Sequence, residues 1–189
     1  MTKVSIIGTG NMGRALEAFF ARGGTDVEVI GHADVDGAEL GDVVVLAVPY
    51  TALAELASTV GPRLAGKVVV DISNPVDFAT FSPIKAAAGS ATAEFAAAVP
   101  DAKVVKAFNT NFSASLSAGT VADGPVSIVI AGEPSAVATL SELATASGAS
   151  AFAAGPIDRA AELEALGFLQ IALAAGEQIG WTNGFVLHK

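Results

Sequence analysis

The sequence of 189 residues contains no cysteine and only two histidines. The absence of cysteine excludes disulfide bonds, thiol nucleophiles and thiolate metal ligands, and we expect no metal site. Basic residues are also scarce, since ten lysines and arginines stand against nineteen aspartates and glutamates, for a formal net charge of −9. Nucleic-acid phosphates bind to basic surfaces. This charge balance therefore argues against a nucleic-acid partner.

Long hydrophobic runs are missing as well. The most apolar long stretch, residues 165–176, is about 12 residues long and contains Gln170, whereas a membrane-spanning helix needs about 20. The first residues, Met1-Thr2-Lys3, lead directly into an apolar run, so no signal peptide is expected. These features predict a cytoplasmic protein without membrane contact.

What remains is a regular alternation of short apolar runs with helical segments. The predicted strands cover residues 4–7, 27–30, 43–48, 68–72, 104–107, 126–131 and 150–153. The predicted helices cover residues 14–22, 51–60, 92–99, 135–146 and 158–179. Only residues 31–42 join the second and third strands, which leaves room for one short helical turn near 35–40. The alternation predicts an α/β fold with a Rossmann-type, doubly wound, mostly parallel sheet.

The segment Gly8-Thr9-Gly10-Asn11-Met12-Gly13 follows the first strand and begins the first helix. This spacing of glycines is typical of a turn that holds a dinucleotide pyrophosphate. Gly8 permits the tight turn, Gly10 lets the backbone approach phosphate oxygens, and Gly13 lets the helix pack closely on the strand. The start of the helix also offers free N–H groups to an anion. A purely structural turn is the alternative interpretation.

The end of the second strand bears on the choice of coenzyme. An acidic residue at this corner usually holds the ribose 2′-hydroxyl of NAD, but here His32 takes its place and Asp34 comes two residues later. Because an imidazole can donate a hydrogen bond to a 2′-phosphate, His32 favours NADP, with NAD as the alternative. His32 could also be an exposed loop residue that leaves the 2′ position unread.

Three further segments follow predicted strands, at the edge where open α/β sheets place their ligands. They are Ala47-Val48-Pro49, Ser73-Asn74-Pro75 and Lys106-Ala107-Phe108-Asn109-Thr110. The amide groups of Asn74 and Asn109 suit a carboxamide or the edge of a heterocycle. The alternative is that these asparagines only shape turns.

These segments fit one known pattern in order along nearly the whole chain. The glycine motif, Ala47-Val48-Pro49, the run from Val104 to Thr110, and Gly155-Pro156-Ile157 with the following Glu162 and Glu164 carry it. The chain thereby resembles the NADPH-dependent coenzyme F420 reductase family, and the related ferric-reductase domains of STEAP metalloreductases. The resemblance implies a Rossmann domain over residues 1–155. It also implies a small helical portion over residues 156–189, which helps to form a deazaflavin pocket and a dimer contact.

The resemblance also implies roles for individual residues. Thr9, Asn11 and Met12 would line the pyrophosphate, Ala47, Val48 and Pro49 would flank the adenosine and ribose, and Ala107 would lie near the nicotinamide. The predicted cofactor site further includes Gly8, Gly10, Gly13, His32 and Asn74. The acceptor is expected at Pro75, Phe108, Asn109 and Thr110. The family commonly carries Ser-Arg where this chain has His32-Ala33, and the family's following helix is largely deleted here.

The expected reaction is hydride transfer between NADP(H) and a small-molecule acceptor of the deazaflavin (coenzyme F420) or flavin type. Such a transfer needs two stacked rings and little acid–base help, so no catalytic side chain is predicted. Lys106 is the one rival for an acid–base role, although strand alternation could instead make it a solvated edge residue. Two other interpretations are a dinucleotide-sensing or interaction module without turnover, and a pyrroline-carboxylate reductase, which needs a longer helical region.

The last predicted helix, Asp158–Ile179, carries apolar residues on more than one face. They are Leu163, Leu166, Phe168, Leu169, Ile171 and Leu173. A helix that is apolar all round is normally buried on every side, whereas one sheet covers a single face. We therefore expect this helix to pair with its copy in a homodimer. The alternative is a monomer in which Phe185 and Val186 fold back over the helix.

Overall fold

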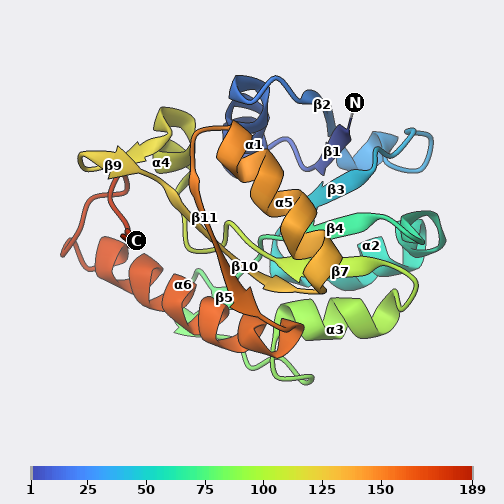
Figure 1. Ribbon diagram of the computed structural model, residues 1–189. Coiled ribbons are helices and arrows are strands. Elements are labelled where there is room, and N and C mark those ends of the chain that lie inside the picture. Colours follow the sequence, from blue (N-terminus) through green and yellow to red (C-terminus); the bar gives the residue numbers. More distant parts are fainter. Residues whose placement is uncertain (1, 189) are drawn as a thin grey trace.

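The computed structural model describes residues 2–188 and shows a seven-stranded sheet between two layers of helices (Figure 1). The strand order is β11-β10-β7-β4-β3-β1-β2. The strands are β1 (Lys3–Ile7), β2 (Asp26–Ile30), β3 (Val43–Leu46), β4 (Val68–Asp71), β7 (Lys103–Lys106), β10 (Ser127–Gly132) and β11 (Ser150–Gly155). The predicted fold class and the predicted strands are confirmed. Two small hairpins lie outside this sheet: β5 (Val76–Asp77) with β6 (Ser82–Pro83), and β8 (Thr120–Val121) with β9 (Gly124–Pro125).

The helices also follow the sequence pattern closely. They are α1 (Asn11–Arg22), α2 (Leu53–Val60), α3 (Ala91–Ala98), α4 (Ser113–Ala118), α5 (Pro134–Ala146) and α6 (Ala160–Ala175). Short 3₁₀ turns are η1 (His32–Asp34), η2 (Tyr50–Ala52), η3 (Gly61–Leu64) and η4 (Ile157–Arg159). Among the described residues, none of these helices combines the length and apolar character needed to cross a membrane.

Several boundaries differ from the prediction, and two of the differences change the shape of the chain. The last helix ends at Ala175 rather than near residue 179, because Gly176 caps it and Glu177 takes a left-handed backbone with φ of 56°. The short turn after the second strand lies at His32–Asp34 rather than near residues 35–40, because the Asp34 amide already bonds to the Gly31 carbonyl at 3.1 Å. The chain therefore turns as soon as β2 ends.

The order of the strands decides where a ligand can bind. Strands β2, β1, β3, β4 and β7 are parallel neighbours, while β10 runs antiparallel to β7 and pairs in parallel with β11. The chain leaves β1 toward β2, then crosses back over β1 to form β3 on its other side. In open α/β sheets, the crevice lies where the direction of winding reverses. Here that point is the gap between the carboxyl ends of β1 and β3.

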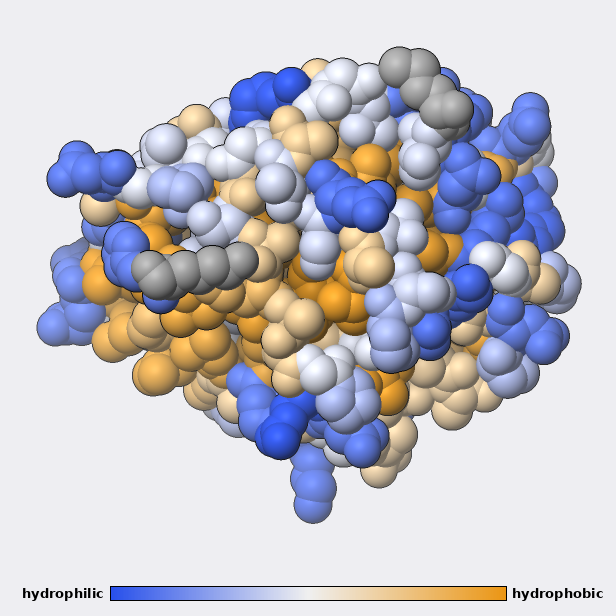
Figure 2. Space-filling view, in the orientation of Figure 1, coloured by the Kyte–Doolittle hydropathy of each residue, from blue (hydrophilic) through white to orange (hydrophobic). Residues whose placement is uncertain are grey.

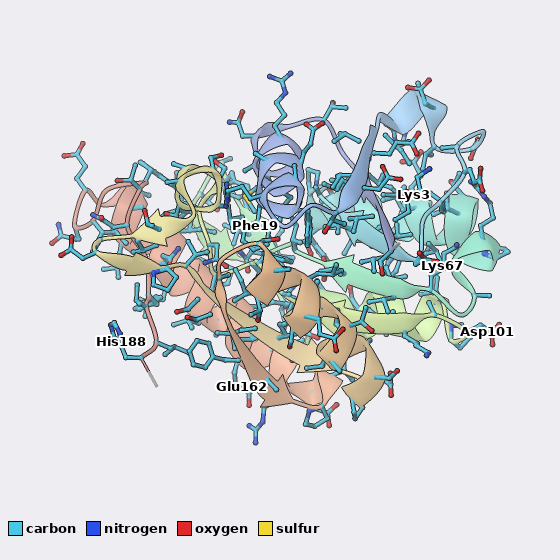
Figure 3. The ribbon with its side chains drawn as sticks, turned by 45° about the horizontal axis from the view of Figure 1, so that its top comes forward. Lys3, Phe19, Lys67, Asp101, Glu162 and His188 are labelled. Carbon is cyan, nitrogen blue, oxygen red and sulfur yellow. The ribbon has the colours of Figure 1, made fainter. Side chains whose placement is uncertain are left out.

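The apolar pattern explains both layers of the core. Strand β3 reads Val-Val-Val-Leu and is buried at every residue, as a strand covered on both faces must be. Successive side chains point to opposite faces, so Val43 and Val45 pack with α1, α4 and α5, whereas Val44 and Leu46 pack with α2 and α3. Figure 3 shows Lys3, Lys67 and Asp101, which precede or begin strands, at the amino edge of the sheet. The polar residues of the candidate site lie at the other edge.

The turn between β1 and α1 depends on Gly13. A Cβ atom at Gly13 would lie 1.9 Å from the carbonyl oxygen of Gly8, so no side chain fits there without moving the backbone. Helix α1 can therefore approach the strand closely only because this position has no side chain. This is the packing role that the sequence predicts for Gly13.

We expect Gly13→Ala to lower the free energy of unfolding by about 1–3 kcal/mol, because overpacking forces the turn and helix apart. The measurement is a urea titration followed by circular dichroism. Gly37→Ala is the matched control, since a Cβ there meets nothing within 4 Å. Equal stability of the two variants would contradict the close packing of α1 on the turn.

Candidate functional site

The loop between β1 and α1 forms an open cradle of backbone groups. Gly8 has φ of 127°, a conformation that favours glycine, and its amide donates to the Ile30 carbonyl at 2.9 Å. Gly10 precedes the first residue of α1, no side chain caps this helix end, and its first turn holds no acidic residue. A Cβ placed on Gly10 meets no atom within 4 Å. Free N–H groups thus face open space, the arrangement that binds a phosphate.

The predicted segment after β3 lies beside this cradle. The Ala47 amide donates to the Ile7 carbonyl at 2.8 Å, and a Cβ at Gly8 would lie 2.2 Å from the Ala47 oxygen. Ala47 and Val48 are half-buried and Pro49 is exposed. The structure therefore brings the glycine loop and the third strand end together at the winding reversal. Of the loop's other residues, Thr9 and Asn11 are exposed and Met12 is half-buried.

Tyr50, the next residue, borders a groove of about 550 Å³ between α2 and α3. Its hydroxyl donates to the carboxylate of Glu94 at 2.8 Å. This hydrogen bond to Glu94 raises the pKa of the Tyr50 phenol above its ordinary value of 10.0, because it stabilises the protonated form. Tyr50 is therefore a neutral hydrogen-bond donor at the rim of the site.

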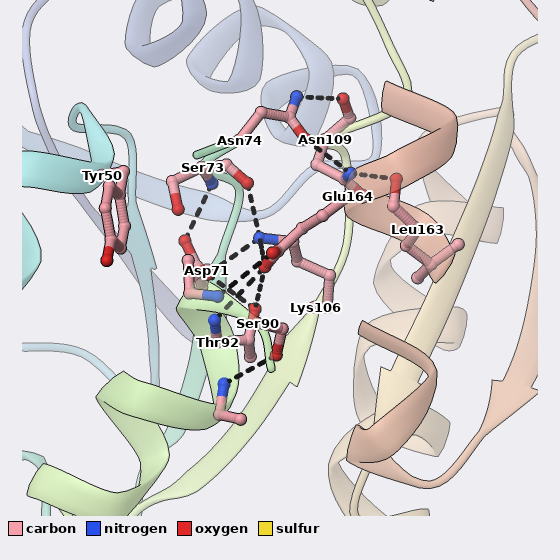
Figure 4. Close-up of polar contacts among 12 residues, drawn as sticks. Tyr50, Asp71, Ser73, Asn74, Ser90, Thr92, Lys106, Asn109, Leu163 and Glu164 are labelled. Atoms are coloured by element: carbon pink, nitrogen blue, oxygen red, sulfur yellow. Dashed lines mark hydrogen bonds and ion pairs between the residues drawn. The ribbon is translucent and has the colours of Figure 1, made fainter. Parts of the chain in front are cut away.

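Beneath the strand ends lies a buried cluster of charges that the sequence did not predict (Figure 4). The ammonium of Lys106, at the end of β7, lies 2.9 Å from Asp71 Oδ2 and 3.0 Å from Glu164 Oε1. It also donates to the Ser73 carbonyl. Its three N–H groups thus meet three acceptors, and the side chain is completely buried. The alternative that Lys106 is a solvated edge residue is wrong, and the amine has no donor left for a substrate.

Glu164 links this cluster to two helices. It lies on α6, and its carboxylate accepts from the amides of Ala91 and Thr92 at 3.1 and 3.3 Å, at the start of α3. The Thr92 hydroxyl donates to Asp71 Oδ2 at 2.7 Å, and Asp71 Oδ1 accepts from the Ser73 amide at 2.8 Å. The cluster therefore joins β4, β7, α3 and α6. An aspartate directly after three valines, at 68–71, is the signal in the sequence that a buried partner exists.

The two predicted asparagines also converge, and they bond to each other. Asn74 Nδ2 donates to the Asn109 carbonyl at 2.8 Å, while Asn109 Nδ2 donates to Asn74 Oδ1 at 2.9 Å and to the Leu163 carbonyl at 2.7 Å. Gly167 lets α6 approach them, since a Cβ there would lie 2.6 Å from Asn74 Oδ1. The pair therefore fastens α6 over the strand ends. The Asn109 Oδ1 atom is buried and has no hydrogen-bond partner in the described part of the chain.

Known proteins share parts of this sequence. A family model described as NADP oxidoreductase, coenzyme F420-dependent, matches residues 26–75. Over 186 residues the chain is 31% identical to the metalloreductase STEAP3 of Rattus norvegicus, a match that covers 87% of this chain and 36% of STEAP3. These two matches show that the chain is similar to the F420-dependent NADP oxidoreductase family. It spans little more than a third of its STEAP3 relative.

Two solved structures share this fold. A hypothetical protein from Sinorhizobium meliloti is 31% identical, with a TM-score of 0.71 over 83% of this chain and 86% of that one. A candidate F420-dependent NADP-reductase from Arthrobacter sp. FB24 is 24% identical, with a TM-score of 0.83 and 100% of both chains covered. The second likeness shows that the fold is shared from end to end.

The other predicted acceptor residues lie inside the protein. Phe108 is completely buried. Its ring makes edge-to-face contacts with Phe19 and Phe20, at centroid distances of 5.5 and 5.7 Å. Its backbone has φ of 59°, an uncommon left-handed conformation for a phenylalanine. Pro75 and Thr110 are also buried, and so is Ala107, which the resemblance places near the nicotinamide. The structure gives Phe108 a core position that fixes the bend after β7, rather than a position at the surface.

The side chains at the corner after β2 lie on the surface. His32 is exposed, and its Nε2 atom lies 3.5 Å from Oε1 of Glu55, on the first turn of α2. The structure thus places a carboxylate beside the imidazole that was predicted to meet a 2′-phosphate. Within residues 2–188 there is no group of three or more histidine, cysteine or acidic side chains arranged to hold a metal ion.

We expect Lys106→Met to lower the free energy of unfolding by about 3–5 kcal/mol, because it leaves the carboxylates of Asp71 and Glu164 buried without their cation. A urea titration measures this loss. Lys103→Met, on the same strand, is the matched control, because its ammonium contacts the Ser135 hydroxyl at the surface. The control should change stability by less than about 0.5 kcal/mol. Losses of equal size would show that the cluster does not stabilise the fold.

Proposed function

We propose that this chain transfers hydride between a nicotinamide dinucleotide, NADP(H) in the family that it resembles, and an acceptor of the deazaflavin (coenzyme F420) or flavin type. The open space at Gly10, next to an uncapped helix start, is the observation that carries the proposal. It lies at the reversal of winding between β1 and β3, where open α/β sheets bind nucleotides. The glycine loop fits the pyrophosphate, which NADP(H) and NAD(H) share.

The polar groups at the strand ends support a reaction in which the chain positions its ligands. Lys106 has all its donors engaged, Asn74 and Asn109 bond to each other, and Asn109 also donates to the Leu163 carbonyl of α6. None of these groups is arranged to take or give a proton. Bound nicotinamide and deazaflavin or flavin rings supply the hydride chemistry themselves, whereas a protein supplies proximity and orientation. Helix α6, fixed over the strand ends, is the wall against which an acceptor ring would be oriented.

Gly10→Val tests the dinucleotide site. The side chain has room in the free protein, and the φ of −74° suits an L-residue, so the variant should fold normally. The added methyl groups would occupy the space of the pyrophosphate. We expect Gly10→Val to abolish binding of reduced dinucleotide in a fluorescence titration, and Gly10→Ala to weaken it by a smaller factor. Unchanged affinity in a folded Gly10→Val protein would contradict the site.

Turnover is measured separately, as oxidation of the reduced dinucleotide with coenzyme F420 or with FAD or FMN as acceptor. Oxidation that Gly10→Val abolishes supports the proposed reaction. Tight dinucleotide binding without oxidation by either class of acceptor would overturn the reaction and favour a dinucleotide-sensing module. The two measurements therefore separate an enzyme from a binding protein.

We further propose that the chain forms a homodimer through α6 and the segment after it. This segment folds back in part, since the Phe185 amide donates to Gln170 Oε1 at 3.2 Å and the Trp181 ring lies 4.9 Å from that of Phe112. It still leaves Leu169, Trp181 and Leu187 about half exposed, at 50%, 51% and 46%. Figure 2 shows a continuous hydrophobic area on this side, over α6. A two-fold contact would bury such an area.

Leu169→Glu should convert the dimer to a monomer, because each copy would bring a carboxylate into the contact. Size-exclusion chromatography with light scattering at micromolar concentration measures the mass. Ala138→Glu, at an exposed position of α5, is the matched control and should leave the mass unchanged. A monomeric wild-type chain would contradict the dimer.

A further inference from the structure

The corner after β2 brings a carboxylate back to the glycine loop. After Gly31 the chain enters η1, and the Asp34 amide donates to the Gly31 carbonyl at 3.1 Å. This turn folds the Asp34 side chain over the end of β2. Its Oδ2 atom lies 3.1 Å from the point where a Cβ on Gly31 would be, and Thr9 Cγ2 lies 3.9 Å from the same point. Asp34 therefore lies beside the glycine loop, at the corner where the sequence predicts His32.

A hollow opens next to this carboxylate. Strand β2 is the last strand on its side of the sheet, so no strand within residues 2–188 pairs with its outer edge. The hollow measures about 610 Å³ and is lined by β2 and by small residues of the following loop, among them Gly31, Ala33, Gly37 and Ala38, together with Asp34. A ligand that lies along the glycine loop can thus reach the Asp34 carboxylate.

The two basic side chains near this corner donate to main-chain carbonyls. Arg63 contacts the connection after β2, but its guanidinium donates to the main-chain carbonyls of Val35, Asp36 and Ala38. The Lys67 ammonium likewise donates to the carbonyls of Leu40 and Gly41, both at 3.0 Å. Both cations therefore bind the main chain of the connection, and neither lines the hollow. The ionisable side chains that line the hollow are the carboxylates of Glu28 and Asp34.

His32 does not supply a free cation either. Its Nε2 atom lies 3.5 Å from Glu55 Oε1, so the imidazole already has an anionic neighbour on α2. A dianionic 2′-phosphate placed at this corner would face Asp34 and Glu55, two carboxylates. In dinucleotide-binding folds an arginine accommodates that phosphate, whereas a carboxylate accepts a hydrogen bond from the 2′-hydroxyl. The corner therefore fits a ribose with a free 2′-hydroxyl and does not fit a 2′-phosphate.

We infer that Asp34 accepts a hydrogen bond from the 2′-hydroxyl of the adenosine ribose, and that this chain binds NAD(H) in preference to NADP(H). The inference rests on the proposed dinucleotide site and refines its coenzyme. The family is named for NADP, and the sequence favours NADP on the ground that His32 follows β2. Position along the chain does not show which side chain the turn η1 brings to this corner. The fold of η1 puts the acidic residue back into the corner.

The test compares NADH with NADPH in fluorescence titrations of the full chain. We expect NADH to bind at least about tenfold more tightly, the effect of one close charge–charge repulsion in a partly solvated site. Asp34→Asn keeps the size of the side chain and removes the charge. It should weaken NADH binding, strengthen NADPH binding, and change the ratio of the two dissociation constants by about tenfold.

Two further variants make the result specific. Glu55→Gln should improve NADPH binding and leave NADH binding nearly unchanged, since Glu55 lies beside His32, where only the added phosphate of NADPH would come near it. Asp36→Asn is the matched control on the same connection, and it should leave the ratio within about twofold of that of the wild type. A ratio that responds equally to Asp34→Asn and Asp36→Asn would show a general field effect and overturn the role of Asp34.

The outcomes separate this inference from the proposed function. If both coenzymes bind, Gly10→Val abolishes both, and NADPH is the tighter ligand, then the coenzyme preference is wrong while the dinucleotide site stands. If neither coenzyme binds to the folded chain, the site and the preference fail together. Tighter binding of NADH that is lost in Asp34→Asn supports the inference.

Discussion

The ammonium of Lys106, enclosed by Asp71 and Glu164, is the contact on which the carboxyl edge of the sheet depends. Removing an ion from water costs several kcal/mol, and this cost is offset only when good geometry and further hydrogen bonds satisfy every group. Here the lysine meets three acceptors, and Glu164 also receives two amides at the start of α3. Since these partners come from β4, β7, α3 and α6, a single arrangement of the four elements satisfies them. The surface offered to a ligand follows from that arrangement.

Much of the fold can be predicted from the sequence because its signals are local. Runs such as Val43–Leu46 indicate strands covered on both faces, and the glycine spacing predicts a turn whose packing at Gly13 the structure shows. The buried cluster could not be predicted in the same way. Asp71 and Glu164 lie 93 positions apart, and neither residue's neighbours reveal that both meet Lys106. Only the aspartate in an apolar run indicates that a partner must exist.

The corner after β2 shows a second limit of sequence reasoning. Counting residues from the glycine motif places His32 at the ribose, but the 3₁₀ turn shifts the functional position by two residues. The asparagines show a related limit. Their convergence follows from the parallel strands, whereas their mutual hydrogen bonds depend on how closely α6 approaches at Gly167. In both cases a backbone path decides which side-chain atoms are available, and residue spacing does not determine that path.

The short connection between β2 and β3 also affects how the protein behaves toward its own copies. It leaves β2 as an edge strand, and the free N–H and C=O groups of an edge can pair with a strand from another molecule. Asp26 and Glu28 are exposed along this edge strand, and Glu28 is held by Lys3 at 2.7 Å. Two copies aligned edge to edge here would bring like charges together. Charged side chains on an edge strand disfavour its pairing with the edge of a second copy.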